Sequence, residues 1–353
     1  MNSNSADRSG RSIRHRIVDE LVTKAYHAVD AGDLASARVA LERAAPLARG
    51  LGPQPAARVH LAQAAVVQAT GDWGAASAIV GQVLAGAKSR HLPSSVSFQL
   101  NVRVRLGGLL LLQGHLSTAE KVLTEALSAY ELLPFTAPDD IARTCIELAS
   151  LNRITGRHQE AGVFLDRAHA VLRAARGAYV PALAPVWRER SHLASELGDP
   201  EKAESAARRA LDIRLRALGM GHLTVAAERT VLAAALMRLG RLEDAEEQLH
   251  RALTTFRRVL GPAHAEVAAT LRTLGRIALR QGRDRSAERF LDEALAVTQN
   301  AQGGAHPDVA DLLEQLAVIQ HKRGEAEAAA ALTARAHRIR SWRTARKQRV
   351  PAS

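Results

Sequence analysis

Residues 267–294 read VAATLRTLGRIALRQGRDRSAERFLDEA, and this stretch decides the fold. Gly282 is followed by Ala287, Leu291 and Ala294, at steps of five, four and three residues. The last three residues therefore share one face of a helix that begins after the glycine. Residues 267–281 carry a second helical periodicity, so the stretch predicts two antiparallel helices joined by a tight turn at Gly282.

The glycine–alanine pair recurs through the chain. The eight pairs are Gly32/Ala37, Gly71/Ala76, Gly114/Ala119, Gly156/Ala161, Gly198/Ala203, Gly240/Ala245, Gly282/Ala287 and Gly324/Ala329, which start 39, 43, 42, 42, 42, 42 and 42 residues apart. A fixed period of this length indicates a stacked array, because each copy can bury its apolar face only against its neighbours.

The segments between copies carry helix-start signals. Residues 261–266 (GPAHAE) and 304–308 (GAHPD) place turn residues before an acid, whose carboxylate meets the positive end of the helix dipole. His222, His264 and His306 recur at the same place in three copies. Neighbouring helices pack about 8 to 10 Å apart, whereas zinc binds nitrogen at about 2.0 to 2.1 Å. We therefore interpret these histidines as helix-start residues and not as a metal site.

The repeat resembles the tetratricopeptide repeat, in the 42-residue form found in kinesin light chains. Leu271, Leu274, Gly275 and Ala278 fall on the family's first-helix positions. The family's first-helix Trp and Tyr are mostly replaced here, with Trp187 as the one aromatic residue at the first of those sites. The opening helices of the first two copies are degenerate.

This resemblance implies an all-α fold, a right-handed α-solenoid of about eight helix-turn-helix repeats. The solenoid is expected over residues 14–342, between a flexible basic tail at residues 1–13 and a basic tail at residues 343–353. In the family, the first helices line a concave surface that holds peptides or protein segments. A likeness of fold indicates how a partner binds and not which partner it is.

The family's ligand-contacting positions give the candidate partner-binding residues. They are Asn101, Arg105, Arg143, Arg153, Arg188, His192, Arg272 and Arg276. Arg272 and Arg276 are one helical turn apart, so their guanidinium groups could together receive a carboxylate or phosphate. The eighth copy presents Asp311 and Glu314 instead, so the sign of the charge changes along the surface. The alternative is that these are ordinary solvated side chains of an Arg-rich chain.

Composition sets further bounds. Of 353 residues, 47 % are hydrophobic but only 3 % aromatic, so packing must rely on Ala and Leu. The net charge of +12 suggests an acidic partner, although the excess of Arg over Lys can also come from genome base composition. The single cysteine, Cys145, excludes an intramolecular disulfide and fits a reducing compartment. Neither a signal-peptide core nor a bilayer-length apolar run is present, which predicts a cytoplasmic protein without membrane insertion.

These observations favour a binding protein. The sequence has no phosphate-cradling glycine loop, nucleophile elbow or metal-ligand pair, so we expect no enzyme activity, cofactor or metal. We expect a non-catalytic scaffold or adaptor that binds another protein or a peptide in its concave groove, where the arginines favour an acidic ligand. The basic run at residues 343–349 (RTARKQR) leaves a regulatory protein that contacts nucleic acid through its basic ends as the alternative.

Overall fold

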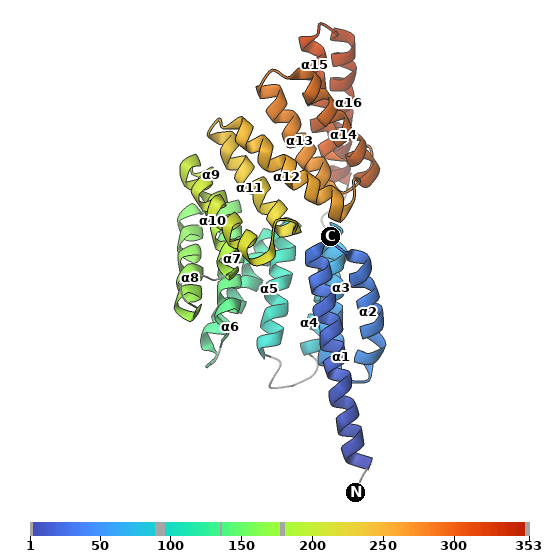
Figure 1. Ribbon diagram of the computed structural model, residues 1–353, viewed down its shortest axis with the longest axis vertical. Helices are drawn as coiled ribbons and strands as arrows, with labels where there is room; N and C mark the ends of the chain where they lie inside the picture. The colour runs from blue at the N-terminus through green and yellow to red at the C-terminus, as the bar shows by residue number, and fades with distance from the viewer. Residues whose placement is uncertain (1–2, 89–95, 135, 177–180, 350–353) are drawn as a thin grey trace. The chain divides into compact units, whose positions relative to one another are not determined.

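The structure, a computed structural model, describes residues 3–88, 96–134, 136–176 and 181–349. These residues form helices joined by short turns, with no β-strand among them. They divide into an N-terminal unit, Met1–Ala217, and a C-terminal unit, Leu218–Ser353. Each unit is a row of helical hairpins (Figure 1).

The N-terminal unit holds the first five repeats. Its helices are α1 (Ser3–Ala31), α2 (Leu34–Arg49), α3 (Pro53–Ala69), α4 (Trp73–Lys88), α5 (Val96–Leu112), α6 (Leu116–Leu132), α7 (Pro138–Ile154), α8 (His158–Arg176), the short 3₁₀ turn η2 (Pro181–Leu183), α9 (Ala184–Glu196) and α10 (Pro200–Leu218). Odd-numbered helices are the first helices of the repeats. Each of the first four hairpins packs through its second helix on the next first helix.

The C-terminal unit holds the last three repeats. Its helices are α11 (Leu223–Arg238), α12 (Leu242–Leu260), α13 (Ala265–Arg280), α14 (Asp284–Gln302), α15 (Pro307–Lys322) and α16 (Ala326–Arg349). The prediction of an all-α solenoid is confirmed. Helix α1 begins at Ser3 and α16 continues to Arg349, so helical backbone extends into both segments expected to be tails. None of the helices in the described residues is long and apolar enough to cross a membrane.

The eight repeat glycines all adopt a left-handed backbone, with φ between 71° and 84°. At Gly282, the glycine N–H donates to the Leu279 carbonyl at 3.2 Å and the Arg283 N–H donates to the Ala278 carbonyl at 2.9 Å. This pair of bonds is the Schellman motif, which ends a helix and satisfies its last carbonyls. The predicted turn at the glycine is confirmed.

The three repeated histidines are N-cap residues, as interpreted from the sequence. His222, His264 and His306 directly precede α11, α13 and α15. The Nδ1 atom of each ring accepts the backbone N–H two residues on, at 3.2, 3.1 and 3.2 Å. No group of three or more His, Cys, Asp or Glu side chains in the described residues is placed to hold a metal ion.

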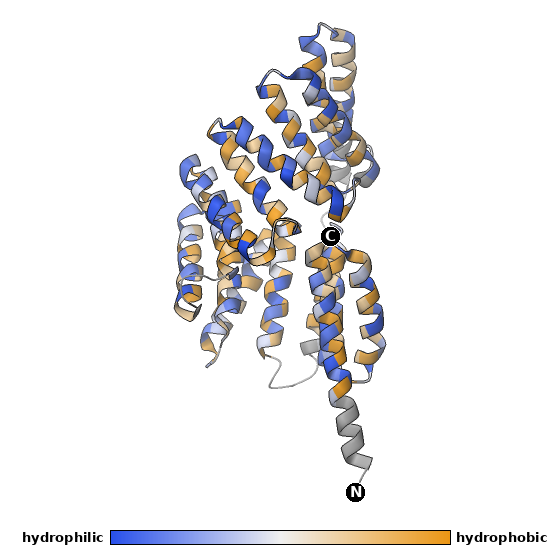
Figure 2. Ribbon diagram, in the orientation of Figure 1, coloured by the Kyte–Doolittle hydropathy of each residue, from blue (hydrophilic) through white to orange (hydrophobic). Residues whose placement is uncertain are grey.

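The core lies between the two helices of each hairpin and, in the N-terminal unit, continues into the next hairpin. Ala287, Leu291 and Ala294 are fully buried, and the close approach also depends on Gly275. A Cβ atom there would lie 2.7 Å from the Leu291 side chain, which is inside van der Waals contact. The helices of Figure 2 carry both hydrophobic and hydrophilic residues, as expected of amphipathic helices with one buried face.

Cys145 lies in the core of the fourth repeat. Its side chain is fully buried, and burial raises the pKa of the thiol to about 11. A thiol that stays protonated is neither a nucleophile nor a metal ligand. The residue therefore serves as packing.

Candidate partner-binding groove

A groove of about 480 Å³ lies between α11 and α13, the first helices of the sixth and seventh repeats. Its walls are small side chains, Thr230 and Ala234 from α11 and Ala269 and Thr273 from α13. Small side chains on two neighbouring helices leave the space that a larger residue would fill. We call this feature the α11–α13 groove.

The two ends of the α11–α13 groove differ in charge. Arg238, Arg276 and Arg280 line it near the C-terminal ends of the two helices, and Glu266 lines it near the start of α13. The Arg280 guanidinium donates to the Met237 carbonyl at 3.0 Å, which fixes one of the three cations in place. The charge of the groove therefore changes along its length, from negative near the start of α13 to positive near the C-terminal ends of α11 and α13.

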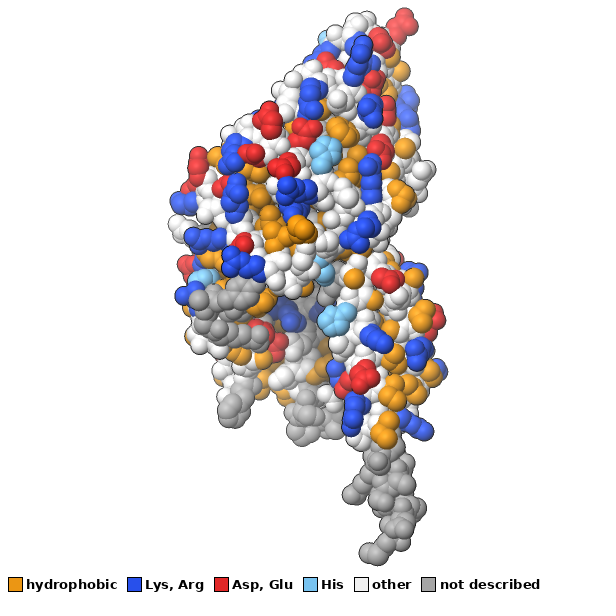
Figure 3. Space-filling model, in the orientation of Figure 1, with side chains coloured by type: hydrophobic (Ala, Val, Ile, Leu, Met, Phe, Trp, Pro, Cys, Tyr) orange, Lys and Arg blue, Asp and Glu red, His pale blue; other side chains and the backbone are white. Residues whose placement is uncertain are grey.

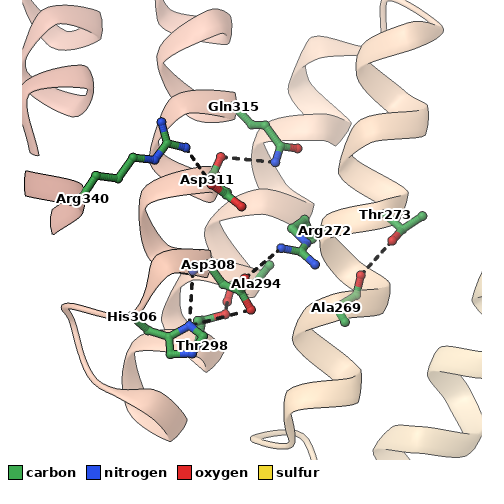
Figure 4. Close-up of polar contacts among 10 residues, drawn as sticks. All are labelled: Ala269, Arg272, Thr273, Ala294, Thr298, His306, Asp308, Asp311, Gln315 and Arg340. Carbon is green, nitrogen blue, oxygen red and sulfur yellow. Dashed lines mark hydrogen bonds and ion pairs between the residues drawn. The ribbon is translucent and has the colours of Figure 1, made fainter. Parts of the chain in front are cut away.

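The two arginines predicted to bind together have different roles. Arg276 is exposed and lines the α11–α13 groove. Arg272 points the other way, toward α15, and its Nη1 lies 3.3 Å from Oδ1 of Asp308 (Figure 4). The same carboxylate stands 3.8 Å from the His306 ring. Arg272 is thus held between two repeats, and Arg276 is the cation that faces the groove.

The acidic residues of the eighth repeat are also paired. Arg340 of α16 donates to Asp311 at 2.8 Å and to Oε2 of Glu314 at 2.9 Å. Figure 4 shows the Arg340 side chain reaching Asp311 on α15. The change in charge sign expected at this repeat is therefore compensated within the last hairpin.

In the N-terminal unit, Asn101 and Arg105 on α5 contact two other first helices. The Asn101 amide donates to Asp140 of α7 at 3.2 Å. Arg105 donates to the Tyr26 hydroxyl of α1 at 3.2 Å and lies 5.8 Å from the centroid of that ring. Both candidates therefore link first helices to each other.

Arg153 on α7 is the centre of a similar link. Its Nε lies 3.2 Å from Oε2 of Glu189, and its Nη1 lies 2.5 Å from Oε1 of Glu196. Both glutamates are on α9. The Arg153 and Glu189 side chains are only 17 % and 15 % exposed, so solvent screens this pair weakly. Arg143 on the same helix is exposed.

The remaining candidates, Arg188 and His192, lie on α9. Both are half-buried, and each already interacts with another group of the protein. Both side chains are therefore already engaged within the protein.

A common pattern explains these pairs. Asn101–Asp140, Arg153–Glu189 and Arg272–Asp308 each join a first helix to the next first helix, at sequence separations of 39, 36 and 36 residues. The acceptors Asp140, Glu189 and Asp308 were not predicted as partners of these side chains. A search for opposite charge one repeat away would have found them.

Charges of both signs are interspersed on the surface. On the face drawn in Figure 3, blue Lys and Arg side chains lie beside red Asp and Glu side chains over α11–α16. The side chains of residues 342–353, which include the basic run, lie outside the described residues. The excess of arginine is therefore partly compensated locally.

Comparisons with known proteins agree with this architecture. The model of the tetratricopeptide repeat family matches residues 140–216 and 223–300. No match was found among curated proteins.

Three solved structures illustrate the likeness of fold. A putative kinesin light chain from Podosopora anserina with nearly identical TPR-like repeats is 21 % identical, over 61 % of this chain and 100 % of that chain, with a TM-score of 0.51. A Rap protein complexed with competence and sporulation factor is 14 % identical, over 92 % and 98 %, with a TM-score of 0.56. A signal transduction ATPase with a tetratricopeptide repeat sensor from Pyrococcus horikoshii is 14 % identical, over 94 % and 48 %, with a TM-score of 0.62.

Repeats of this kind generally mediate protein–protein interactions and are typically non-catalytic. The family match includes four of the glycine turns, at Gly156, Gly198, Gly240 and Gly282, which are evenly spaced. The resemblance inferred from the glycine–alanine period is thus confirmed, and residues 140–216 and 223–300 of the chain match the tetratricopeptide repeat family.

Proposed function

We propose that this chain is a non-catalytic scaffold that binds a peptide segment of another protein in the α11–α13 groove, with a preference for acidic segments. The observation that carries the proposal is Arg276. It is exposed, it lines the groove, and no ion pair holds it among the described residues. A guanidinium group placed in this way is suited to a carboxylate of a bound peptide.

The shape and polarity of the groove support the same function. Its volume falls within the range of about 300 to 1,000 Å³ that is usual for binding pockets. Because the side chains of the groove walls are small, the backbone of a peptide can come close to both helices. Cations near one end and Glu266 near the other favour one orientation of an acidic peptide over the reverse.

The test is selection of peptides from a randomised display library on the full chain, followed by fluorescence polarisation with the selected peptides. We expect acidic sequences to be selected. Arg276→Glu reverses the critical charge, and Ala234→Trp fills the groove without entering the core, because Ala234 is exposed. Each change is expected to weaken binding at least about tenfold, because Arg276→Glu removes one charged hydrogen bond and Ala234→Trp occupies the space of the peptide.

Matched controls lie on the second helix α14. Arg289→Glu and Ala296→Trp make the same chemical changes at exposed positions outside the groove. They are expected to leave binding unchanged. Selection of neutral or basic peptides would refute the acidic preference, and equal losses in groove and control variants would refute the site.

A further inference from the structure

Helices α8, α9 and α10 lie together in the N-terminal unit (Figure 1), and a second cluster of cations lies between them. The ring of Trp187 on α9 is at its centre. The Arg190 guanidinium lies 4.8 Å from the ring centroid and the Arg209 guanidinium of α10 lies 4.6 Å from it. The His169 ring of α8 stands edge-on to the indole, with centroids 5.7 Å apart. We call these residues, with Arg173, the Trp187 cluster.

The other repeats show that this cluster replaces ordinary packing. Arg190 takes the repeat position held by Leu106, Leu148, Leu232, Leu274 and Leu316. His169 takes the position held by Leu84, Leu127, Leu211, Leu253 and Leu295. Most of these leucines are buried in the core. A cation at a packing position forgoes apolar burial, and such local departures from a consistent pattern are expected at functional sites.

The cluster has an excess of positive charge. Arg190 is paired with Asp166, whose Oδ1 lies 2.7 Å from its Nη2. Arg173 and Arg209 are exposed, and neither has an ion pair among the described residues. Three guanidinium groups and one carboxylate leave a local surplus of two positive charges.

The positive charges of these arginines all act on the ring of His169. The pKa of His169 is lowered, first by desolvation and then by the positive charges of Arg190, Arg173 and Arg209, with Asp166 as the one carboxylate that acts in the opposite direction. Arg190 and Arg209 both lie against the Trp187 ring, and Arg173 follows His169 by one turn of α8, so all three arginines are near a group placed beside His169.

Stacking also prepares the arginines for a ligand. A guanidinium group held over an indole ring is fixed in orientation and stays charged. Less side-chain entropy is then lost when an anion binds. A phosphate ester carries about −1.5 to −2 charges at neutral pH and three acceptor oxygens, which matches the surplus of two cations.

We propose that the Trp187 cluster binds the phosphate of a phosphorylated side chain on a partner protein. The site is separate from the α11–α13 groove and does not depend on the function proposed for it. Arg209 and Arg173 supply the unpaired charges, His169 supplies a ring N–H, and Trp187 holds Arg190 and Arg209 in position.

The test is calorimetric titration of the full chain with a short Gly/Ser peptide that carries one phosphoserine. Its unphosphorylated twin and a single-stranded DNA oligonucleotide are the comparison ligands. We expect saturable binding of the phosphopeptide and none of the twin. Arg209→Gln is expected to weaken binding at least about tenfold, whereas Arg208→Gln, at the adjacent exposed arginine paired with Glu204, is expected to leave it unchanged.

A second variant separates binding from folding. His169→Leu with Arg190→Leu restores the residue most common at both repeat positions, so the fold is expected to survive or gain stability while phosphopeptide binding is lost. Thermal unfolding of each variant checks this. The proposal is overturned if the twin peptide binds equally, if Arg208→Gln causes the same loss, if the restored variant binds like the wild type, or if only the oligonucleotide depends on Arg209. Ala234→Trp is expected to bind the phosphopeptide normally.

Discussion

At the scale of single residues, the glycine turns make a direct prediction. Gly282 has a φ of 71°, where a Cβ atom costs about 1 to 2 kcal/mol. Gly282→Ala should therefore lower the free energy of unfolding by about 1 kcal/mol. Urea denaturation followed by circular dichroism measures the change. Gly304→Ala is the control, because Gly304 has no left-handed backbone and no atom close to its added Cβ, and an equal loss there would contradict the explanation.

Glu147 predicts an unusual dependence of stability on pH. Its carboxyl group packs against Gly108 of α5, where a Cβ would lie 3.1 Å from Oε2. Burial, and secondly the charge of Glu189, raise the pKa of Glu147 to about 7, and Arg143 opposes both effects. In the unfolded chain an ordinary glutamate titrates near about 4.3. The folded state thus binds the extra proton in this window, and stability falls as the pH rises from about 4.3 to 7.

Glu147→Gln should remove this slope, which amounts to about 1 to 3 kcal/mol across the window. The measurement is the urea midpoint of unfolding at pH 5 and at pH 8. The midpoint of the variant should rise relative to that of the wild type only at pH 8. Glu160→Gln changes an exposed glutamate on α8 and should keep the wild-type profile. A slope that persists in Glu147→Gln would assign the pH dependence to other groups.

At the scale of helices, apolar packing and ion pairs should contribute very differently. Leu291 is fully buried between α13 and α14, so Leu291→Ala should cost about 2 to 5 kcal/mol of unfolding free energy. Arg272 and Asp308 link α13 to α15 with side chains 30 % and 42 % exposed, so Arg272→Ala should cost less than about 1 kcal/mol. Urea denaturation of both variants tests the ranking, which is wrong if the two losses are similar.

The helices could be predicted because their signals are local and repeated. The left-handed turn that ends a first helix favours glycine, as at Gly282. Ala287 and Ala294 lie on one helix face because of their spacing alone. The polar contacts could not be predicted in the same way. Whether Arg272 faces a ligand or Asp308 depends on which side chains of two adjacent first helices meet, and that distance is set by packing between repeats. The α11–α13 groove likewise appears only when α11 and α13 are placed side by side.

The Trp187 cluster was missed for another reason. Trp187 was noted as an aromatic residue at a family position, but its neighbours belong to three helices. The available signal was the loss of leucine at the positions of His169 and Arg190. Comparison of each repeat with the others, position by position, would have shown it.

At the scale of the whole molecule, the repeat should behave as a removable module. Gly261 and Gly303 have nearly the same backbone, with φ, ψ of 86°, 161° and 86°, 156°. Deletion of residues 261–302 therefore joins α12 to the turn before α15 without changing the local geometry. We expect a folded chain with unchanged ellipticity per residue, because each repeat contacts only its neighbours. A deletion of residues 261–281, which leaves α14 without α13, should instead lose helicity and cooperativity, and equal behaviour of both deletions would contradict the modular description.

The buried thiol makes the opening of one repeat observable. Cys145 is the single cysteine of the chain, has no exposed surface and holds its proton tightly. A thiol-reactive dye can label the native chain only in the moments when α7 separates from its neighbours. The labelling rate therefore measures how often the fourth repeat unfolds locally, and no engineered probe is needed. It reports on that repeat even while the other repeats stay folded.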